Sequence, residues 1–337
     1  TLKLLHHIGG SPVRGLAKRR CLDWILRRAS QDGEAATDGL GAIFPPMVYI
    51  QIALMAMGWK RSDPILRRAE KDLDDFFVHQ RDDDGDYIMI QPCFSPVWDT
   101  GYALYTLTEC GLRQGDPSVD AASAWLLEKE CAFRGDWADG VSLPADATGW
   151  YFEYHNAWYP DVDDTAQVAM ALHRTAADTG CAAGERGVKW LLAMQNDDGG
   201  WAAFDRTKHR PILEYVPFAD HNAMQDPSCP DITGRILECL AWHGYTTKDD
   251  VVQRAIVYIK SCQTSDGAWI GRWGVNYLYG TWQALLGPLR CGVDPNEDWV
   301  QHAAQWVRSV QQSDGSFGET ADTYLDPSLK GTGISTA

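Results

Sequence analysis

Apolar residues recur at helical spacing through most of the chain, in segments that alternate between two kinds. The first kind is amphipathic, as in residues 188–194 and 255–259, where apolar side chains lie three or four positions apart. The second kind is apolar on nearly all sides, which is typical of a buried helix. Segments of the second kind are 100–107, 165–172, 233–240 and 281–286. The pattern predicts an all-α fold built from helix pairs, with one short strand at 87–90.

A motif of the form Q-x3-G-x-W follows the amphipathic helices and marks the repeat. Residues 195–201 and 263–269 match it, and residues 311–317 match it with Phe in the last position. A variant with one extra residue runs from Glu130 to Trp137, and weaker variants begin at Gln80 and Gln31. Glycine tolerates the left-handed conformation that ends helices, so we expect the Asp-Gly pair of each copy to stop the helix before it.

Two architectures bury a repeat of one amphipathic and one apolar helix. In an α/α barrel the apolar helices form an inner ring and the amphipathic helices an outer ring. In an open α-solenoid the pairs stack in a row, and periodicity favours neither arrangement. A boundary is indicated near residues 92–96, and residues 335–337 resemble the start of one more inner helix.

The amino-acid composition disfavours several classes of protein. The chain has 337 residues, of which 30 are basic and 46 acidic, and its net charge of −16 disfavours nucleic acid as a partner. Its nine cysteines form no C-x-x-C pair, so neither a zinc finger nor a disulfide framework is expected. The 15 tryptophans require a physical use, either in a packed core or around an aromatic cavity.

The candidate chemistry lies in a cluster of aspartates, Asp161, Asp163 and Asp164, at the start of an apolar helix. Acidic residues at this place commonly cap the helix, and capping is the alternative interpretation. The same D-x-D-D pattern occurs at residues 72–75, within a charged amphipathic stretch, where we expect a solvated face. The pattern alone is therefore a weak signal, and its context decides.

Context favours an acid at residues 161–164. An aromatic segment at 149–159 precedes the cluster, and crowding carboxylates in an apolar setting raises their pKa values. One aspartate would then keep its proton and serve as an acid, with Arg235 as the best-placed cation. Aromatic faces attract cations, so an acid among rings suits protonation of an alkene and guidance of the resulting carbocation.

Several segments together resemble the squalene–hopene cyclases, which are class II triterpene cyclases that carry QW repeats. The resemblance extends through the chain and suggests an internal fragment that lacks both ends of a cyclase. It rests on residues 41–46, 95–100, 149–152, 159–166, 226–235 and 271–280.

The resemblance implies roles for individual residues. Asp163 matches the proton donor, Asp161 and Asp164 its flanking carboxylates, and Tyr279 a tyrosine near the acid. Arg235 stands where some members have His, although Arg does not exchange a proton near neutral pH. Asp99 and Asp231 match supporting polar residues. The substrate-binding positions are Trp98, Phe152, Trp273, Phe204, Phe218 and Ile43, while His221 stands where some relatives have Phe.

The resemblance also implies the organisation and setting of the protein. Residues 94–337 are expected to form most of the barrel that carries the acid, and residues 1–93 part of a second α/α barrel. The expected reaction is cyclisation of squalene to hopene-type pentacyclic products, without metal or cofactor. The expected location is peripheral, on the cytoplasmic side of a bacterial membrane, and a homodimer is compatible with the family.

Two other functional classes remain open on the residues alone. The first is a different enzyme on a similar barrel, such as a glycosidase or a prenyltransferase subunit. A glycosidase needs carboxylates about 5–10 Å apart across a sugar, which adjacent aspartates do not suggest. The second is a non-catalytic helical-repeat binding module, which a polar inner ring would favour.

Overall fold

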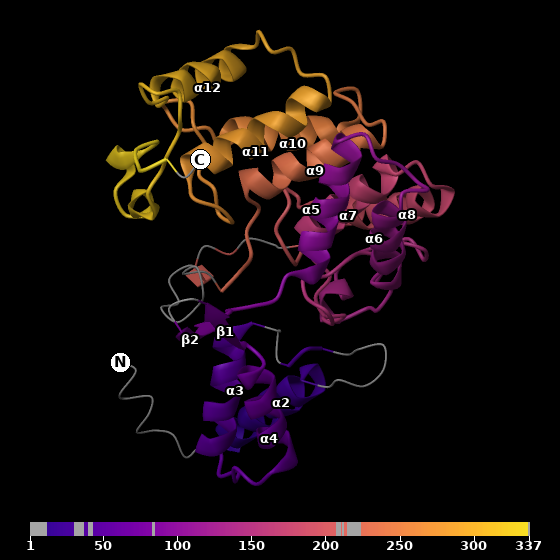
Figure 1. Ribbon diagram of the computed structural model, residues 1–337, viewed down its shortest axis with the longest axis vertical. Coiled ribbons are helices and arrows are strands. Elements are labelled where there is room, and N and C mark those ends of the chain that lie inside the picture. The colour runs from indigo at the N-terminus through magenta and orange to yellow at the C-terminus, as the bar shows by residue number, and fades with distance from the viewer. Residues whose placement is uncertain are drawn as a thin grey trace. The chain divides into compact units, whose positions relative to one another are not determined.

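Helices make up most of the regular structure, as the hydrophobic pattern predicts. The computed structural model describes residues 12–29, 37–39, 43–82, 85–206, 210, 212–213 and 224–335. The longer elements (Figure 1) are α2 (Pro12–Arg28), α3 (Phe44–Ala56), α4 (Pro64–Asp74), β1 (Phe77–Asp82), β2 (Gly85–Ile90), α5 (Pro96–Glu109), α6 (Pro117–Glu128), α7 (Val162–Arg174), α8 (Asp178–Met194), α9 (Pro230–Trp242), α10 (Asp250–Ser261), α11 (Tyr277–Arg290) and α12 (Asp298–Ser309). The predicted strand at 87–90 lies within β2, which pairs antiparallel with β1.

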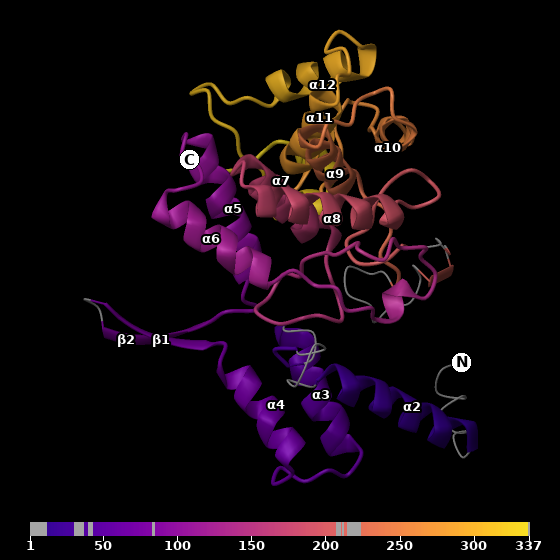
Figure 2. The same cartoon turned by 90° about the vertical axis from the view of Figure 1, so that its right-hand side faces the viewer.

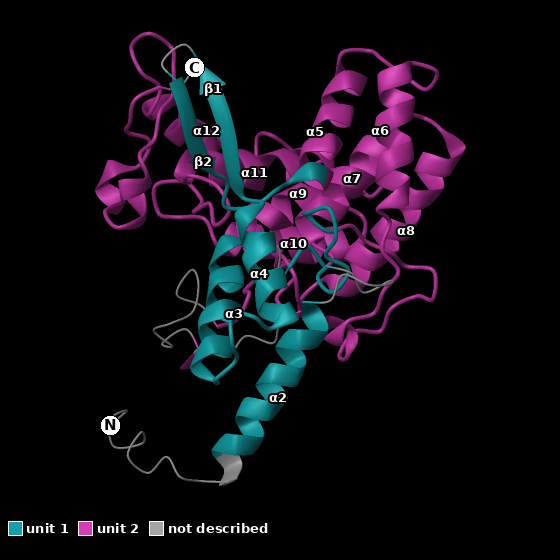
Figure 3. Ribbon diagram, turned by 60° about the horizontal axis from the view of Figure 1, so that its bottom comes forward, with its two compact units in different colours: residues 1–96, 151–159 teal, residues 97–150, 160–337 magenta. Residues whose placement is uncertain are grey.

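The chain divides into two units, coloured separately in Figure 3. The first unit comprises Thr1–Pro96 and Tyr151–Tyr159, and the second comprises Val97–Trp150 and Pro160–Ala337. Within the first unit, the Arg28 guanidinium lies between the rings of Trp24 and Trp158, 3.7 and 4.2 Å from their centroids. These contacts hold the 151–159 segment within the first unit. The predicted division into parts of two barrels stays a prediction.

The second unit has two layers of helices (Figure 1 and Figure 2), the arrangement of an α/α barrel. Helices α5, α7, α9 and α11 form the inner layer, and α6, α8, α10 and α12 the outer layer. Gly234 allows α9 and α11 to pack closely. A Cβ at this position would lie 2.0 Å from the Gln283 carbonyl oxygen of α11 and would clash with it. The helix pairs and their two layers follow the prediction.

The expectation that every inner helix is buried holds for only two of them. Helices α7 and α9 are buried along most of their length, because α9 packs between α7 and α11, and α7 packs between α9 and α5, where Gly101 lies against Val168. Helices α5 and α11 lie at the ends of the described inner layer and keep exposed residues, such as Trp282 at 51% exposure. Burial here depends on neighbours as well as on apolar composition.

Each full motif ties three helices together through hydrogen bonds of its first and last residues. The Trp201 indole donates to the Leu191 carbonyl of α8 at 2.7 Å. The Trp201 backbone N–H donates to the Thr233 hydroxyl of α9 at 3.0 Å, and Gln195 donates to the Val251 carbonyl of α10 at 2.9 Å. The next repeat makes the same three bonds through Trp269, Gln263, Ile259, Thr281 and Trp299. The motif therefore sets the spacing between one helix pair and the next.

Two details of the predicted repeat are wrong. Helix α8 ends at Met194, before the motif, so Gly199, with φ of +93°, forms the following turn and does not stop the helix. The second concerns the variant that ends at Trp137. The equivalent bonds are made by Trp150, whose indole donates to the Leu126 carbonyl at 2.7 Å and whose N–H donates to the Thr165 hydroxyl at 2.9 Å. Spacing misled here because a long loop separates the helix from its tryptophan.

Candidate active site

The aspartate cluster lies at the N-terminus of α7, where only one carboxylate serves as the cap. Oδ1 of Asp161 accepts hydrogen bonds from the backbone N–H groups of Asp163 and Asp164, at 2.6 and 3.0 Å. Capping thus explains Asp161, as the alternative interpretation required. The other two carboxylates are not needed as caps, and Asp163 forms a contact with a neighbouring helix.

Asp163 forms a buried ion pair with Arg235 of α9. Its Oδ1 atom lies 2.5 Å from the Arg235 Nε atom, and the two side chains are 13% and 4% exposed. Asp163 is therefore shielded from bulk water, and its partner is the cation that the sequence indicated. A helix N-terminus and a buried guanidinium both stabilise the ionised carboxylate.

The Arg235 guanidinium is held by polar and aromatic groups of two inner helices. Its Nη1 atom donates to the Tyr102 hydroxyl at 2.6 Å and to the Gln167 side-chain oxygen at 3.3 Å. The guanidinium carbon lies 5.1 Å from the ring centroid of Trp98. The Trp98 ring packs edge-on against the Tyr102 ring, with their centroids 4.8 Å apart. These contacts orient the Arg235 side chain so that its Nε atom faces Asp163.

Burial dominates the electrostatics of the cluster. It raises the pKa of Asp163 to about 6, with the Asp231 charge adding to the rise and Arg235 opposing it. The pKa of Asp161 is raised well above its usual range by burial and by the neighbouring Asp163 charge. The expected effect of crowding carboxylates in an apolar setting is therefore seen at Asp161 and Asp163.

Asp231 and Tyr279 complete the polar surroundings of the acid. Oδ2 of Asp231 accepts from the backbone N–H groups of Arg272 and Trp273, at 2.8 and 2.9 Å. The pKa of the Tyr279 hydroxyl is raised by burial and then by the Asp163 charge, while Arg235 lowers it. The side chains of Asp163, Arg235, Asp231 and Tyr279 therefore interact electrostatically within one site.

Aromatic rings gather around this polar centre. Phe204 and Trp273 pack edge-on with centroids 6.1 Å apart, and Trp273 is 41% exposed. Tyr279 packs on Trp282 at the same separation. Of these aromatic residues, Tyr279 interacts with the Asp163 charge and the Trp273 backbone binds Asp231, while Trp98 and Tyr102 contact Arg235.

The remaining candidates are Asp99, Ile43, Phe152, Phe218 and His221. Asp99 lies in the first turn of α5 and is exposed. Ile43 and Phe152 belong to the first unit, so their part in the site stays a prediction. Phe218 and His221 lie outside the described residues.

Tyr102 and Gln167 contact Arg235, and the sequence interpretation missed both. Each lies one helical turn after a recognised residue, Tyr102 after Trp98 and Gln167 after Asp163. Positions i and i+4 share a helix face, so this spacing was the available signal.

The described residues contain neither a candidate metal site nor a candidate membrane-spanning helix. No group of three or more His, Cys, Asp or Glu side chains there could hold a metal ion. Within the same residues, no helix is both long enough and apolar enough to span a bilayer.

Nearly the whole chain matches models of known protein families. Residues 94–337 match the squalene-hopene cyclase C-terminal domain, and residues 1–82 match the N-terminal domain. The chain belongs to the squalene–hopene cyclase family.

Individual relatives agree with this assignment. The chain is 39% identical to a squalene–hopene cyclase of Bradyrhizobium diazoefficiens, over 91% of this chain and 46% of that protein. It is 37% identical to the squalene–hopene cyclase of Alicyclobacillus acidocaldarius, over 96% and 50%. It is also 36% identical to a dammaradiene synthase of Dryopteris crassirhizoma, over 99% and 51%. The chain spans about half the length of the curated relatives it matches.

A type II terpene cyclase from Scytonema is similar in structure. The alignment has 14% sequence identity and a TM-score of 0.44, and it covers 83% of this chain and 68% of that one.

Proposed function

We propose that the complete protein is a class II triterpene cyclase that protonates a double bond of squalene and directs its polycyclisation. The observation that carries this proposal is the buried Asp163 carboxyl, paired with Arg235, whose guanidinium lies over the Trp98 ring. Family membership supports the same chemistry. A non-catalytic binding module would have no use for such an acid.

In the proposed first step, the Asp163 carboxyl transfers its proton to one carbon of a terminal alkene. A C–H bond forms, the alkene π pair is consumed, and the other carbon becomes a tertiary cation. A pKa of about 6 leaves roughly one Asp163 in ten protonated at pH 7. Arg235 then stabilises the carboxylate that remains after transfer, which makes the carboxyl a stronger acid.

In the proposed later steps, each neighbouring double bond attacks the cation in turn and forms a C–C bond. The last cation loses a proton or takes up water. Rings such as Trp98, Tyr102, Phe204 and Trp273 would stabilise the intermediates, since their faces attract positive charge without supplying a nucleophile. Exclusion of water by these rings would also prevent early quenching.

Squalene is the proposed substrate in preference to its epoxide. An epoxide opens with a weaker acid than an alkene requires, and three adjacent aspartates favour the more demanding reaction. The relatives at 36–39% identity carry the names of both hopene-forming and dammaradiene-forming enzymes. We propose hopene-type pentacyclic products, with the product class as an outcome of the experiment below.

The setting of the enzyme is also a proposal. An apolar C30 substrate partitions into lipid, so we propose peripheral attachment to the cytoplasmic side of a bacterial membrane, and a homodimer as the assembly. Sedimentation with vesicles and light scattering of the complete protein test these two points separately.

The function is tested by incubating the complete purified protein with squalene and analysing the products by mass spectrometry. The expected result is a new product with the mass of squalene, or with the mass of squalene plus water. Conversion of oxidosqualene alone would refute the substrate assignment. Absence of turnover with both polyenes, in protein that is folded by circular dichroism, would refute the cyclase itself.

A further inference from the structure

The loop 271–276 lies before α11 and contacts both Asp231 and the Tyr279 ring, and two of its features depend on close packing. A Cβ on Gly274 would lie 2.7 Å from the Tyr279 ring, so only glycine fits beneath that ring. The N–H groups of Arg272 and Trp273, in the same loop, donate to Asp231. The conformation of the 271–276 loop therefore sets the positions of Tyr279 and Asp231 together.

A second segment, residues 319–333, which we call the strap, holds this loop in place. The Tyr324 hydroxyl lies 2.7 Å from the Gly271 carbonyl oxygen and 2.8 Å from that of Gly274, and it donates between the two. The Asn276 side-chain amide donates to the Thr323 hydroxyl at 3.0 Å, and both side chains are buried. Both ends of the loop are thus bound by neighbouring residues of the strap.

The strap also binds the start of α11, which carries Tyr279. Oε2 of Glu319 accepts from the backbone N–H groups of Asn276 and Leu278, at 3.2 and 2.7 Å. A carboxylate suits a helix N-terminus because the free N–H groups there carry partial positive charge. Oε1 of the same side chain accepts from the Gly331 N–H at 3.1 Å, which closes the strap on itself.

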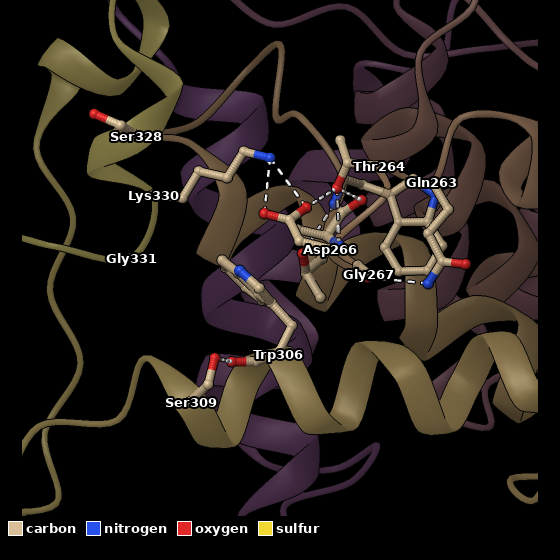
Figure 4. Close-up of polar contacts among 12 residues, drawn as sticks. Gln263, Thr264, Asp266, Gly267, Trp306, Ser309, Ser328, Lys330 and Gly331 are labelled. Atoms are coloured by element: carbon tan, nitrogen blue, oxygen red, sulfur yellow. Dashed lines mark hydrogen bonds and ion pairs between the residues drawn. The ribbon is translucent and has the colours of Figure 1, made fainter.

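The far end of the strap is anchored on the preceding repeat. Figure 4 shows the Lys330 ammonium facing both carboxylate oxygens of Asp266, each at 3.0 Å, in the turn that follows α10. Lys330 also lies 4.5 Å from the centroid of the Tyr277 ring. Gly331 packs against Val310, where a Cβ would lie 2.5 Å from its side chain.

We infer that Tyr324 is a positioning residue, which through the 271–276 loop holds Asp231 and Tyr279 beside the catalytic acid. Tyr324 is not a catalytic residue, since its contacts are to backbone carbonyls of the loop. This inference rests on the proposed cyclase function and adds the strap to its machinery. The Asp231 charge, which raises the pKa of Asp163, is the link from the strap to the reaction.

The test compares the complete wild-type protein with Tyr324→Phe, which removes one hydroxyl and keeps the ring. We expect kcat to fall about tenfold with KM within about twofold, since proton transfer is sensitive to misplacement of its supporting groups. The high-pH limb of the kcat profile should move to lower pH, because a displaced Asp231 no longer raises the pKa of Asp163. A purely structural role would lower the melting temperature without moving that limb.

Two further variants and amide hydrogen exchange distinguish the positioning role of Tyr324 from a general loss of stability. Glu319→Gln should shift the profile in the same direction, and Ser328→Ala, whose hydroxyl bonds Asp326 within the strap, should leave it unchanged. Amide hydrogen exchange at Arg272 and Trp273 should quicken in Tyr324→Phe, whether or not the protein is active. If exchange and profile both match the wild type, the inference is wrong. If wild-type protein lacks turnover, the proposed function fails, and exchange alone decides the role of the strap.

Discussion

The chain contains the D-x-D-D pattern twice, and the two copies differ in their place on the helix and in the origin of their partners. Asp72, Asp74 and Asp75 lie at the C-terminal end of α4, where Asp74 and Asp75 are exposed. Asp161, Asp163 and Asp164 lie at the N-terminal end of α7, with Asp161 and Asp164 buried. An identical pattern thus has opposite relations to the helix dipole. The relation to solvent differs at Asp74 and Asp75, which are exposed, whereas the Asp72 side chain is only 9% exposed.

Their partners differ as well. Asp72 is bound by Arg68 one turn earlier on the same helix, at 3.0 Å, and Lys71 pairs with Asp75 in the same way. Asp163 is bound by Arg235 from another helix, 72 positions along the chain. The first copy is stabilised by local spacing, while the second requires the assembled helix layers.

The largest expected difference between the copies is in turnover. Asp163→Asn should lower kcat at least about 1000-fold, because an amide cannot supply the proton. Asp74→Asn, in the exposed copy, should leave kcat unchanged. Product formation from squalene by both purified variants measures this, with circular dichroism as the check on folding. Substantial turnover by Asp163→Asn would remove the distinction between the copies.

The next largest difference is in stability. Arg235→Gln leaves a buried carboxyl without its cation and should reduce the free energy of unfolding by about 3–5 kcal/mol. Arg68→Gln breaks a pair whose arginine is 42% exposed, so solvent screening limits the loss to about 0.5 kcal/mol. Chemical denaturation of both variants gives the comparison. Equal losses would mean that the Asp163 pair contributes no more than a surface pair.

A smaller effect is expected at Tyr102, whose hydroxyl accepts from Arg235. Tyr102→Phe should reduce the free energy of unfolding by about 1.5–3 kcal/mol, the usual range for a hydrogen bond to a charged group. Tyr105→Phe, on the same helix, removes a longer 3.3 Å bond to Glu238 and serves as the matched control. Thermal unfolding measures both, and a larger loss at Tyr105 would contradict the role assigned to Tyr102.

The smallest effect is the pH dependence of the wild-type protein. The proposed mechanism requires protonated Asp163, so kcat should fall about tenfold per pH unit above a pKa of about 6. The folded-state pKa exceeds the ordinary value of 3.8, so the carboxyl favours the folded state below pH 4. That stabilisation is lost as the pH rises through 6. A kcat that stays constant from pH 5 to 8 would exclude Asp163 as the acid.

Much of the fold could be predicted from the sequence because its determinants are local. Apolar spacing gave the helices of both layers, and the Q-x3-G-x-W motif located the turns that join them. The prediction failed at Trp137, since the hydrogen bonds of the repeat are made by Trp150, which a loop of variable length separates from its helix. A fixed spacing cannot describe such a loop.

The chemistry of the site required the tertiary structure. The sequence by itself indicated the three aspartates and the arginine as candidates, through residue type and through the resemblance of the surrounding segments. It did not separate Asp161 as a cap from Asp163 as an ion-pair partner, and it did not reveal Tyr102, Gln167 or the contacts of Tyr324. Burial and charge proximity depend on distances between segments far apart in the chain, and only packing of the helix layers sets those distances.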